Sequence, residues 1–229
     1  MSACSTLSTS SVDPNAVYKN VKEKTLIKNA EQAAANGKYS SASRMLEAHA
    51  ALYPFSNRER RLVDSAYVYY RQGKAELSEA QCDLYNLEFP NGKFASYMNY
   101  LQGVSEYDRS STALQRLFKT DPSLVNDEHF RNAFISFEKV TEAPYKKDAQ
   151  YRMHVIRNIF ARHQLVIANY YFNRGAYVAA TNRARQIVQQ FNGTMSVKPA
   201  LQLMELSYHQ LGMTDRESEI KGILKQGSA

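Results

Sequence analysis

The residues best suited to catalysis or metal binding are few in this chain, and their spacing favours neither chemistry. The five histidines are scattered singly and form no His-x-x-x-His or Glu-x-x-His pair. A zinc site requires closely spaced histidines or several cysteines, and the chain has only two cysteines. It also lacks the glycine-rich nucleotide loops and the GxSxG nucleophile motif. The sequence therefore predicts no enzyme, no catalytic or metal site and no cofactor.

The two cysteines have different surroundings. Cys82 occupies a packing position in a predicted helix, so we expect a small buried hydrophobe and not a nucleophile. Cys4 follows Ser2 and Ala3, the small residues that end a bacterial lipoprotein cleavage site, although no charged or apolar signal region precedes them. The Ser/Thr-rich stretch after Cys4 is typical of a flexible tether. Lipidation of Cys4 is one interpretation, and a chance occurrence of small residues before a cysteine is the other.

Basic residues outnumber acidic ones, 29 to 22, which gives a formal charge of +7. A basic helical protein can bind nucleic acid, but acidic residues are interspersed throughout and no continuous basic block forms, so we predict no nucleic-acid partner. A surface of mixed charge, an anionic membrane surface next to a lipid anchor, and an acidic peptide tail remain open as explanations. The most basic segments contain Lys19, Lys22, Lys24 and Lys28, and then Arg58, Arg60 and Arg61.

The elements that would position these residues are repeated helix pairs. Hydrophobic residues make up 44% of the chain, and nine Gly and six Pro are too few for a turn-rich β protein. No stretch approaches the roughly 20 apolar residues that span a bilayer. Gly37 and Gly73 each precede a proline by 17 residues and lie 36 residues apart, close to the 34-residue tetratricopeptide (TPR) unit. Further copies surround Gly175 and Gly212.

A third unit is interrupted. Tyr97 to Gly103 resembles the first helix of a pair and Phe130 to Val140 the second, with an insertion within Ser105 to Asp127. Such an insertion is either a candidate binding loop or a tolerated surface loop. The predicted fold is all-α: a right-handed superhelix of about five TPR helix pairs, with an insertion in the third repeat.

The repeats resemble those of the BamD (ComL) family, the TPR lipoproteins of the outer-membrane β-barrel assembly (Bam) complex. The resemblance runs from about Val17 to Gln226, and four stretches of sequence carry it most clearly. The insertion departs from the family pattern, and the fourth repeat ends without the expected proline. The four stretches are Gly37-Lys38-Tyr39 to Phe55-Ser56, Asp64 to Tyr70, Tyr97 to Gly103, and Ala168 to Tyr171 with Gly175 to Arg183.

The resemblance implies a scaffold anchored to the periplasmic face of the outer membrane through an acylated, palmitate-bearing Cys4. It implies four partners: the POTRA domain of BamA, other Bam lipoproteins, unfolded outer-membrane β-barrel proteins, and the membrane itself. We expect residues 1–16 to be the tether, 17–90 repeats 1–2 with a substrate groove, 91–147 the interrupted repeat 3, and 148–229 the BamA-binding repeats 4–5. The alternative function is a TPR adaptor in another envelope process, such as peptidoglycan synthesis or division.

Two sets of residues are candidates for binding. Substrates that end in aromatic residues need apolar pockets rimmed by hydrogen-bond donors, and the first two repeats offer Phe55, Tyr67, Tyr69 and Tyr70. Arg183 lies about 80° from the centre of the apolar stripe of its helix, on the flank that a partner can cover. The resemblance places Asn182-Arg183 at the contact with BamA, where a guanidinium can bind a carboxylate through two parallel hydrogen bonds.

Overall fold

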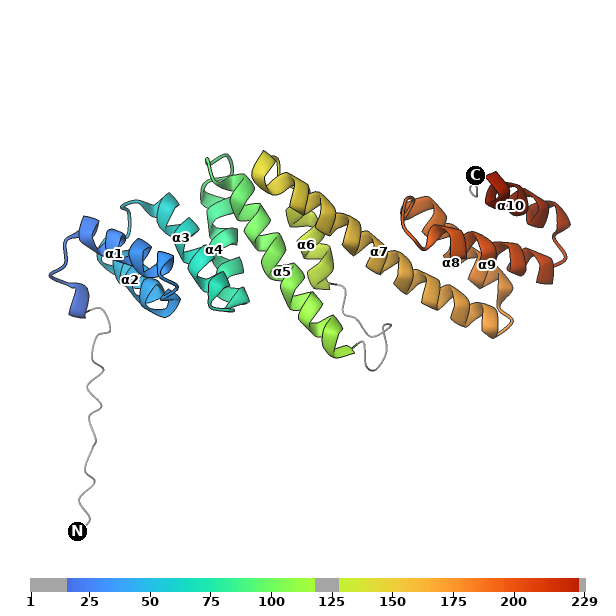
Figure 1. The fold of residues 1–229 in the computed structure, drawn as a ribbon, viewed down its shortest axis with the longest axis horizontal. Helices are drawn as coiled ribbons and strands as arrows, with labels where there is room; N and C mark the ends of the chain where they lie inside the picture. Colours follow the sequence, from blue (N-terminus) through green and yellow to red (C-terminus); the bar gives the residue numbers. More distant parts are fainter. Residues whose placement is uncertain (1–15, 118–127, 227–229) are drawn as a thin grey trace, which may run out of the picture. The chain divides into compact units, whose positions relative to one another are not determined.

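The computed structural model describes residues 16–117 and 128–226, and the part it describes is helical without a strand (Figure 1). The chain forms two compact units, one up to Gln102 and the other from Gly103 onwards. The all-α fold class is confirmed. The described elements are η1 (Ala16–Tyr18), α1 (Glu23–Ala35), α2 (Tyr39–Leu52), α3 (Arg58–Arg71), α4 (Ala75–Glu88), α5 (Ala95–Leu117), α6 (Glu128–Glu138), α7 (Ala143–Asn173), α8 (Tyr177–Gln190), α9 (Val197–Gln210) and α10 (Thr214–Gln226).

Four helix pairs share the glycine turn that the sequence predicts. The first helix of each pair ends in a glycine with φ between 67° and 75°, a left-handed conformation that costs other residues energy. At the first turn Gly37 N–H donates to Ala34 O, and Lys38 N–H donates to Ala33 O. These are the two bonds of the Schellman motif, which satisfy carbonyls at a helix end. The same two bonds recur at Gly73, Gly175 and Gly212.

The first unit packs α1 to α4 and the start of α5. Alanines on α1 and α2 let these two helices approach closely, and Leu46 and Val68 fill the space beside them. A second cluster joins α3, α4 and α5 around Tyr85 and Met98, both fully buried. Cys82 belongs to this cluster and is fully buried, and burial raises the pKa of its thiol. The expected role of Cys82 as a small core residue is thus confirmed.

The insertion is in part a continuation of a helix. α5 runs on through Gly103 to Leu117, so residues 105–117 extend the first helix of the pair and do not form a loop. The rest of the insertion, residues 118–127, lies outside the described residues. Gly103 serves packing here, because a Cβ at this position would lie 2.6 Å from the ring of Phe137 on α6. A glycine inside this helix therefore lets α6 approach α5 closely.

The longest helix of the second unit is α7, with 31 residues. It packs against α6 and also against α8 and α9. The expected domain boundary between residues 147 and 148 lies inside it. No Gly or Pro occurs between Tyr145 and Arg174, so nothing in the sequence interrupts the helix.

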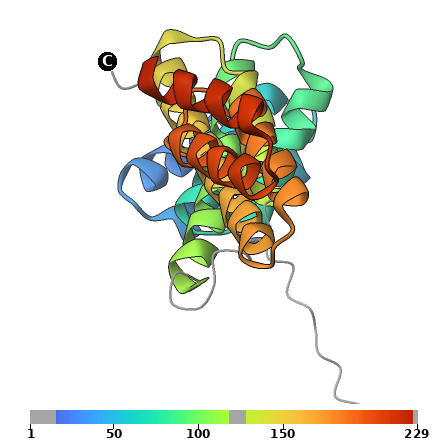
Figure 2. The same cartoon turned by 90° about the vertical axis from the view of Figure 1, so that its right-hand side faces the viewer.

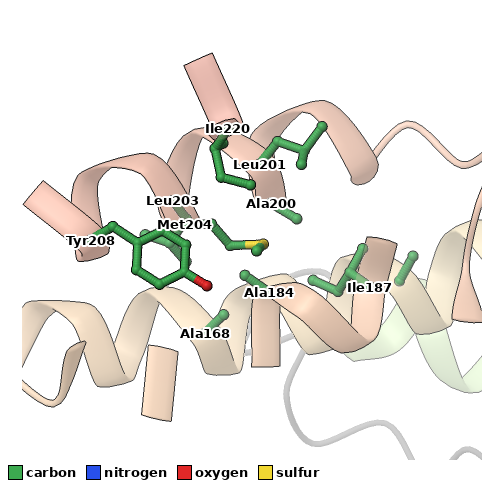
Figure 3. Packing of buried hydrophobic residues seen from close by; sticks show 10 residues of the cluster. Ala168, Ala184, Ile187, Ala200, Leu201, Leu203, Met204, Tyr208 and Ile220 are labelled. Atoms are coloured by element: carbon green, nitrogen blue, oxygen red, sulfur yellow. The ribbon is translucent and has the colours of Figure 1, made fainter. Parts of the chain in front are cut away.

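The C-terminal core is built on small residues. Ala161 and Ala168 of α7 and Ala184 of α8 are fully buried, and larger side chains of α9 and α10 pack over them (Figure 3). Figures 1 and 2 show α9 and α10 side by side, in agreement with their packing against each other. Ile187 and Ile220 each contribute a buried side chain, worth about 1.5–3 kcal/mol.

Candidate functional site

A groove of about 500 Å³ lies between the first helix pair and α3. We call it the N-terminal groove. Alanines of α1 form one wall, Leu46 of α2 and Val68 of α3 form the floor, and charged and aromatic side chains form the rim. A hollow with apolar walls and a few polar groups at its rim suits an extended peptide. The lining residues are Ala30, Glu31, Ala34, Ala35, Tyr39, Leu46, Arg60, Asp64, Tyr67, Val68 and Arg71.

Arg71 forms the polar end of the groove together with two tyrosines. Its guanidinium carbon lies 4.7 Å from the ring centroid of Tyr39 and 5.6 Å from that of Tyr67. The Nη1 atom donates to the Tyr67 hydroxyl at 2.6 Å. The two rings meet edge to face, with centroids 6.3 Å apart. Desolvation raises the pKa of the Tyr39 phenol, so this ring is neutral at physiological pH.

Two other charged residues of the groove, Arg60 and Asp64, form an ion pair. Arg60 Nε donates to Asp64 Oδ2 at 3.0 Å, one helical turn away on α3. Partial burial raises the pKa of Asp64, and the bond from Arg60 opposes that rise. The guanidinium of Arg60 also lies over the ring of Phe94, 5.7 Å from its centroid. Arg60 is therefore paired with a carboxylate, whereas Arg71 donates to a phenol hydroxyl and can bind a further, anionic partner.

A buried polar network fixes the corner next to the groove. Arg61 is 6% exposed, and its guanidinium donates to the carbonyl oxygens of Tyr53, Pro54 and Ser56, at 2.7 to 3.1 Å. Arg61 Nη1 also lies 3.1 Å from Nδ1 of the buried His49. Because a guanidinium can only donate, Nδ1 accepts and Nε2 of His49 donates to Glu23 Oε1 at 3.1 Å.

This network joins α1, α2 and the start of α3 and so holds the walls of the groove in register. Hydrogen bonds from the Ser56 hydroxyl and from His49 lower the pKa of Glu23. Desolvation lowers the pKa of Arg61, but its high ordinary value keeps it charged. A second hollow of about 200 Å³ extends the groove past His49 and Arg61.

The structure brings one of the four predicted groove residues to the groove. Tyr67 lines it. Tyr69 is buried, its hydroxyl donates to Glu47 Oε1 at 2.9 Å, and burial raises the pKa of Tyr69 to about 12. Tyr70 packs against the α3–α4–α5 core. Phe55 is 92% exposed in the turn between α2 and α3 and does not line the groove.

Sequence reasoning missed the charged half of the groove and its first tyrosine. Arg60, Asp64, Tyr67 and Arg71 recur at intervals of three or four residues, which places them on one face of α3. That spacing is a signal from which the shared face of these four residues could have been predicted. Tyr39 directly follows the first glycine turn, and only packing of α2 on α3 brings its ring to Arg71.

Arg183 lies on α8, where the buried stripe of Ala180, Ala184 and Ile187 faces the core. Its side chain is half-buried, as its angle from that stripe predicts, and Nη1 donates to Gln164 Oε1 of α7 at 3.3 Å. The neutral amide leaves the positive charge of Arg183 without compensation from this bond. Cys4 lies outside the described residues.

Within the described ranges, 16–117 and 128–226, no three His, Cys, Asp or Glu side chains gather as metal ligands. None of the helices in these ranges is both long enough and apolar enough to cross a membrane.

A family model described as "YfiO: Outer membrane lipoprotein" matches residues 19–222. The chain belongs to this family. Its relatives include the outer membrane protein assembly factors BamD of Pasteurella multocida, Vibrio cholerae and Neisseria meningitidis. They are 29%, 28% and 26% identical to this chain, over 83%, 91% and 98% of it and 75%, 89% and 86% of their own lengths. The predicted membership of the BamD family and the lipid-anchored location at the outer membrane are thereby confirmed.

Proposed function

We propose that this protein is a non-enzymatic scaffold of the Bam complex, which assembles β-barrel proteins into the outer membrane. Its relatives bear the name of outer membrane protein assembly factors. The observation that carries the binding role is the N-terminal groove, where a positive charge stands over two aromatic rings at the end of a trough lined by both alanines and charged side chains. We assign this groove to the C-terminal segments of unfolded barrel proteins.

The chemistry of the groove suits a peptide that ends in an aromatic residue. The aromatic side chain packs against the alanines of α1 and the rings of Tyr39 and Tyr67. The terminal carboxylate binds the guanidinium of Arg71, which is otherwise bonded to a phenol. Arg60 is bonded to Asp64 and lines the groove farther along the same face of α3. The groove thus recognises an aromatic ring and an adjacent negative charge at the same time.

The second contact is with BamA, through the C-terminal helices. Arg183 stands half-buried on the flank of α8 and bonds a neutral side chain. A carboxylate on a POTRA domain of BamA can take a bidentate bond from this guanidinium. Membership of the BamD family supports this partner, and other lipoproteins of the complex are expected alongside it.

Site-specific crosslinking in cells tests both contacts. A photoreactive residue at Ala35, an exposed position on the groove wall, should capture barrel proteins. The same residue at Leu87, which is 77% exposed and does not line the groove, is the matched control. A third probe at Asn182, exposed beside Arg183, should capture BamA.

Three outcomes separate the proposals. Barrel proteins captured equally at Ala35 and Leu87 would overturn the groove assignment. Capture of BamA elsewhere but not at Asn182 would move the interface away from α8. Recovery of wall-synthesis or division proteins in place of BamA would instead support the alternative adaptor role in the cell envelope.

A further inference from the structure

Four lysines surround the start of the first long helix. Lys19 lies between η1 and α1, Lys22 is the N-cap residue of α1, and Lys24 and Lys28 lie one turn apart on α1. All four side chains are exposed. Val17, in the short helix just before them, is 79% exposed. The segment therefore presents a basic surface with an apolar side chain at its edge, which we call the lysine patch.

The lysine patch points away from the protein core. α1 buries Leu26, Ala30 and Ala33. At about 100° per residue, Lys24 and Lys28 are centred about 170° from that buried stripe. None of the four lysines lines the N-terminal groove. Around the helix, Glu31 lies only about 20° from Lys24, and Ala35 lies on the same face as Lys24 and Lys28, so the lysine patch borders the groove.

Few carboxylates accompany these lysines along the chain. Glu23 is half-buried and accepts hydrogen bonds from His49 Nε2 at 3.1 Å and from Asn57 Nδ2 at 3.3 Å. Glu31, the next acidic residue along the chain, stands at the groove. The segment from Ala16 to Asn29 thus contains four lysines and a single, inward-turned glutamate, and its net charge is positive.

Helix stability does not account for the lysine patch. The N-terminal end of a helix carries a partial positive charge, so basic residues there are disfavoured and acidic ones preferred. Lys22 and Lys24 stand in or next to the first turn of α1 against this preference. Such a conflict between local preference and sequence is expected where a residue serves binding.

We propose that the lysine patch binds anionic lipid headgroups of the membrane to which the protein is anchored. Members of the family are lipoproteins, and Cys4 precedes Lys19 by 15 residues, a length of chain that reaches at most about 50 Å. One acyl chain anchors a protein only marginally, and a basic patch is a common second signal. Lysines near an anionic surface each strengthen binding several-fold. The lysine patch thereby holds the first repeat at the membrane surface.

Vesicle sedimentation tests this proposal with the full chain carrying Cys4→Ser, so that no lipid contributes. The protein should sediment with vesicles that contain phosphatidylglycerol and stay in solution with phosphatidylcholine alone, at physiological ionic strength. Replacing all four lysines of the patch by Gln should lower the partition coefficient at least about tenfold. The melting temperature should stay unchanged or rise, because the helix dipole favours the loss of these charges.

A matched control makes the same change of charge elsewhere. Lys146, Lys147, Lys198 and Lys225 are also exposed, and their replacement by Gln should leave vesicle binding close to that of the parent. An equal loss of vesicle binding in both quadruple variants would show that net charge alone attracts the protein to the vesicles. This result would overturn the proposal for the lysine patch. Failure of the parent to sediment with anionic vesicles would overturn it as well. Neither result bears on peptide or BamA binding, which fluorescence anisotropy and calorimetry measure without a membrane.

Discussion

Replacing Arg71 by Met tests how the N-terminal groove recognises its peptide. The substitution removes the guanidinium but keeps an unbranched apolar side chain against Tyr39 and Tyr67. Loss of a hydrogen bond to a charged group typically costs about 1.5–3 kcal/mol. For a peptide with an aromatic C-terminal residue and a free carboxylate, we therefore expect Kd to rise roughly tenfold to a hundredfold.

The fold should tolerate this change. The Arg71 side chain is exposed, and its contacts with the two rings are surface contacts. A cation–π contact at an exposed site contributes about 0.5–1 kcal/mol. Arg71 makes two such contacts, so for a chain of this length the melting temperature should fall by at most about 8 °C. A larger fall would mean that lost binding reflects lost structure.

Fluorescence anisotropy with two labelled peptides isolates the carboxylate. The first peptide ends in a free carboxylate and the second in an amide, with the same sequence. Amidation should weaken binding to the parent protein by about the same factor as Arg71→Met does, and should have little further effect on the Arg71→Met protein. Arg44→Met, a change at an exposed arginine of α2 that does not line the groove, is the matched control.

Two results of this comparison of two peptides and two proteins would contradict the role of Arg71. If amidation weakens binding equally in the parent and in Arg71→Met, another group receives the carboxylate. If amidation has no effect on either protein, the groove does not recognise the carboxylate of the peptide terminus. The assignment of Arg71 as the group that binds it is then wrong.

Three other substitutions probe separate parts of the protein. Arg183→Ser should leave the melting temperature nearly unchanged but weaken BamA binding by about 2–5 kcal/mol, and calorimetry with an isolated POTRA domain would show it; wild-type affinity would place the interface elsewhere. Cys4→Ser, in a precursor with a full signal, should move the protein from the outer membrane to the soluble periplasmic fraction, as immunoblots of the fractions would show. Unchanged sedimentation with membranes would count against lipidation of this cysteine. Arg61→Ala should lower the free energy of unfolding in urea by about 3 kcal/mol, because backbone carbonyls and His49 lose their buried donor; a loss below about 1 kcal/mol would mean that water replaces the guanidinium.

The repeats themselves were predictable because their signals are local. Gly37, Gly73, Gly175 and Gly212 each end a helix in the left-handed conformation, and the same pair of Schellman bonds follows at each. Only a glycine adopts that conformation without strain. The angle of Arg183 from its buried stripe was predictable for the same reason, since residue spacing alone fixes position around a helix.

The length of the helices was harder to predict, because a repeat pattern does not show where a helix continues. Gly103 resembles a turn glycine in its repeat position, yet α5 passes through it and extends to Leu117. The reason lies in packing: the ring of Phe137 occupies the space that a side chain at this position would fill. α7 likewise runs through the expected boundary at residue 147, where the chain has no breaking residue.

By itself the sequence determined the helix pairs, their turns and the family of the protein, because glycine conformation and apolar periodicity act over a few residues. It could not decide which aromatic residues face the N-terminal groove. The buried residues of α3 span much of its circumference, so the spacing that groups Tyr67 with Arg60, Asp64 and Arg71 does not by itself show which face borders a groove until α1, α2 and α4 are packed around the helix. The tertiary structure bonds Tyr69 to Glu47 and leaves Tyr67 beside Arg71 and Tyr39. That choice depends on contacts between helices that lie far apart in the sequence, which no local pattern encodes.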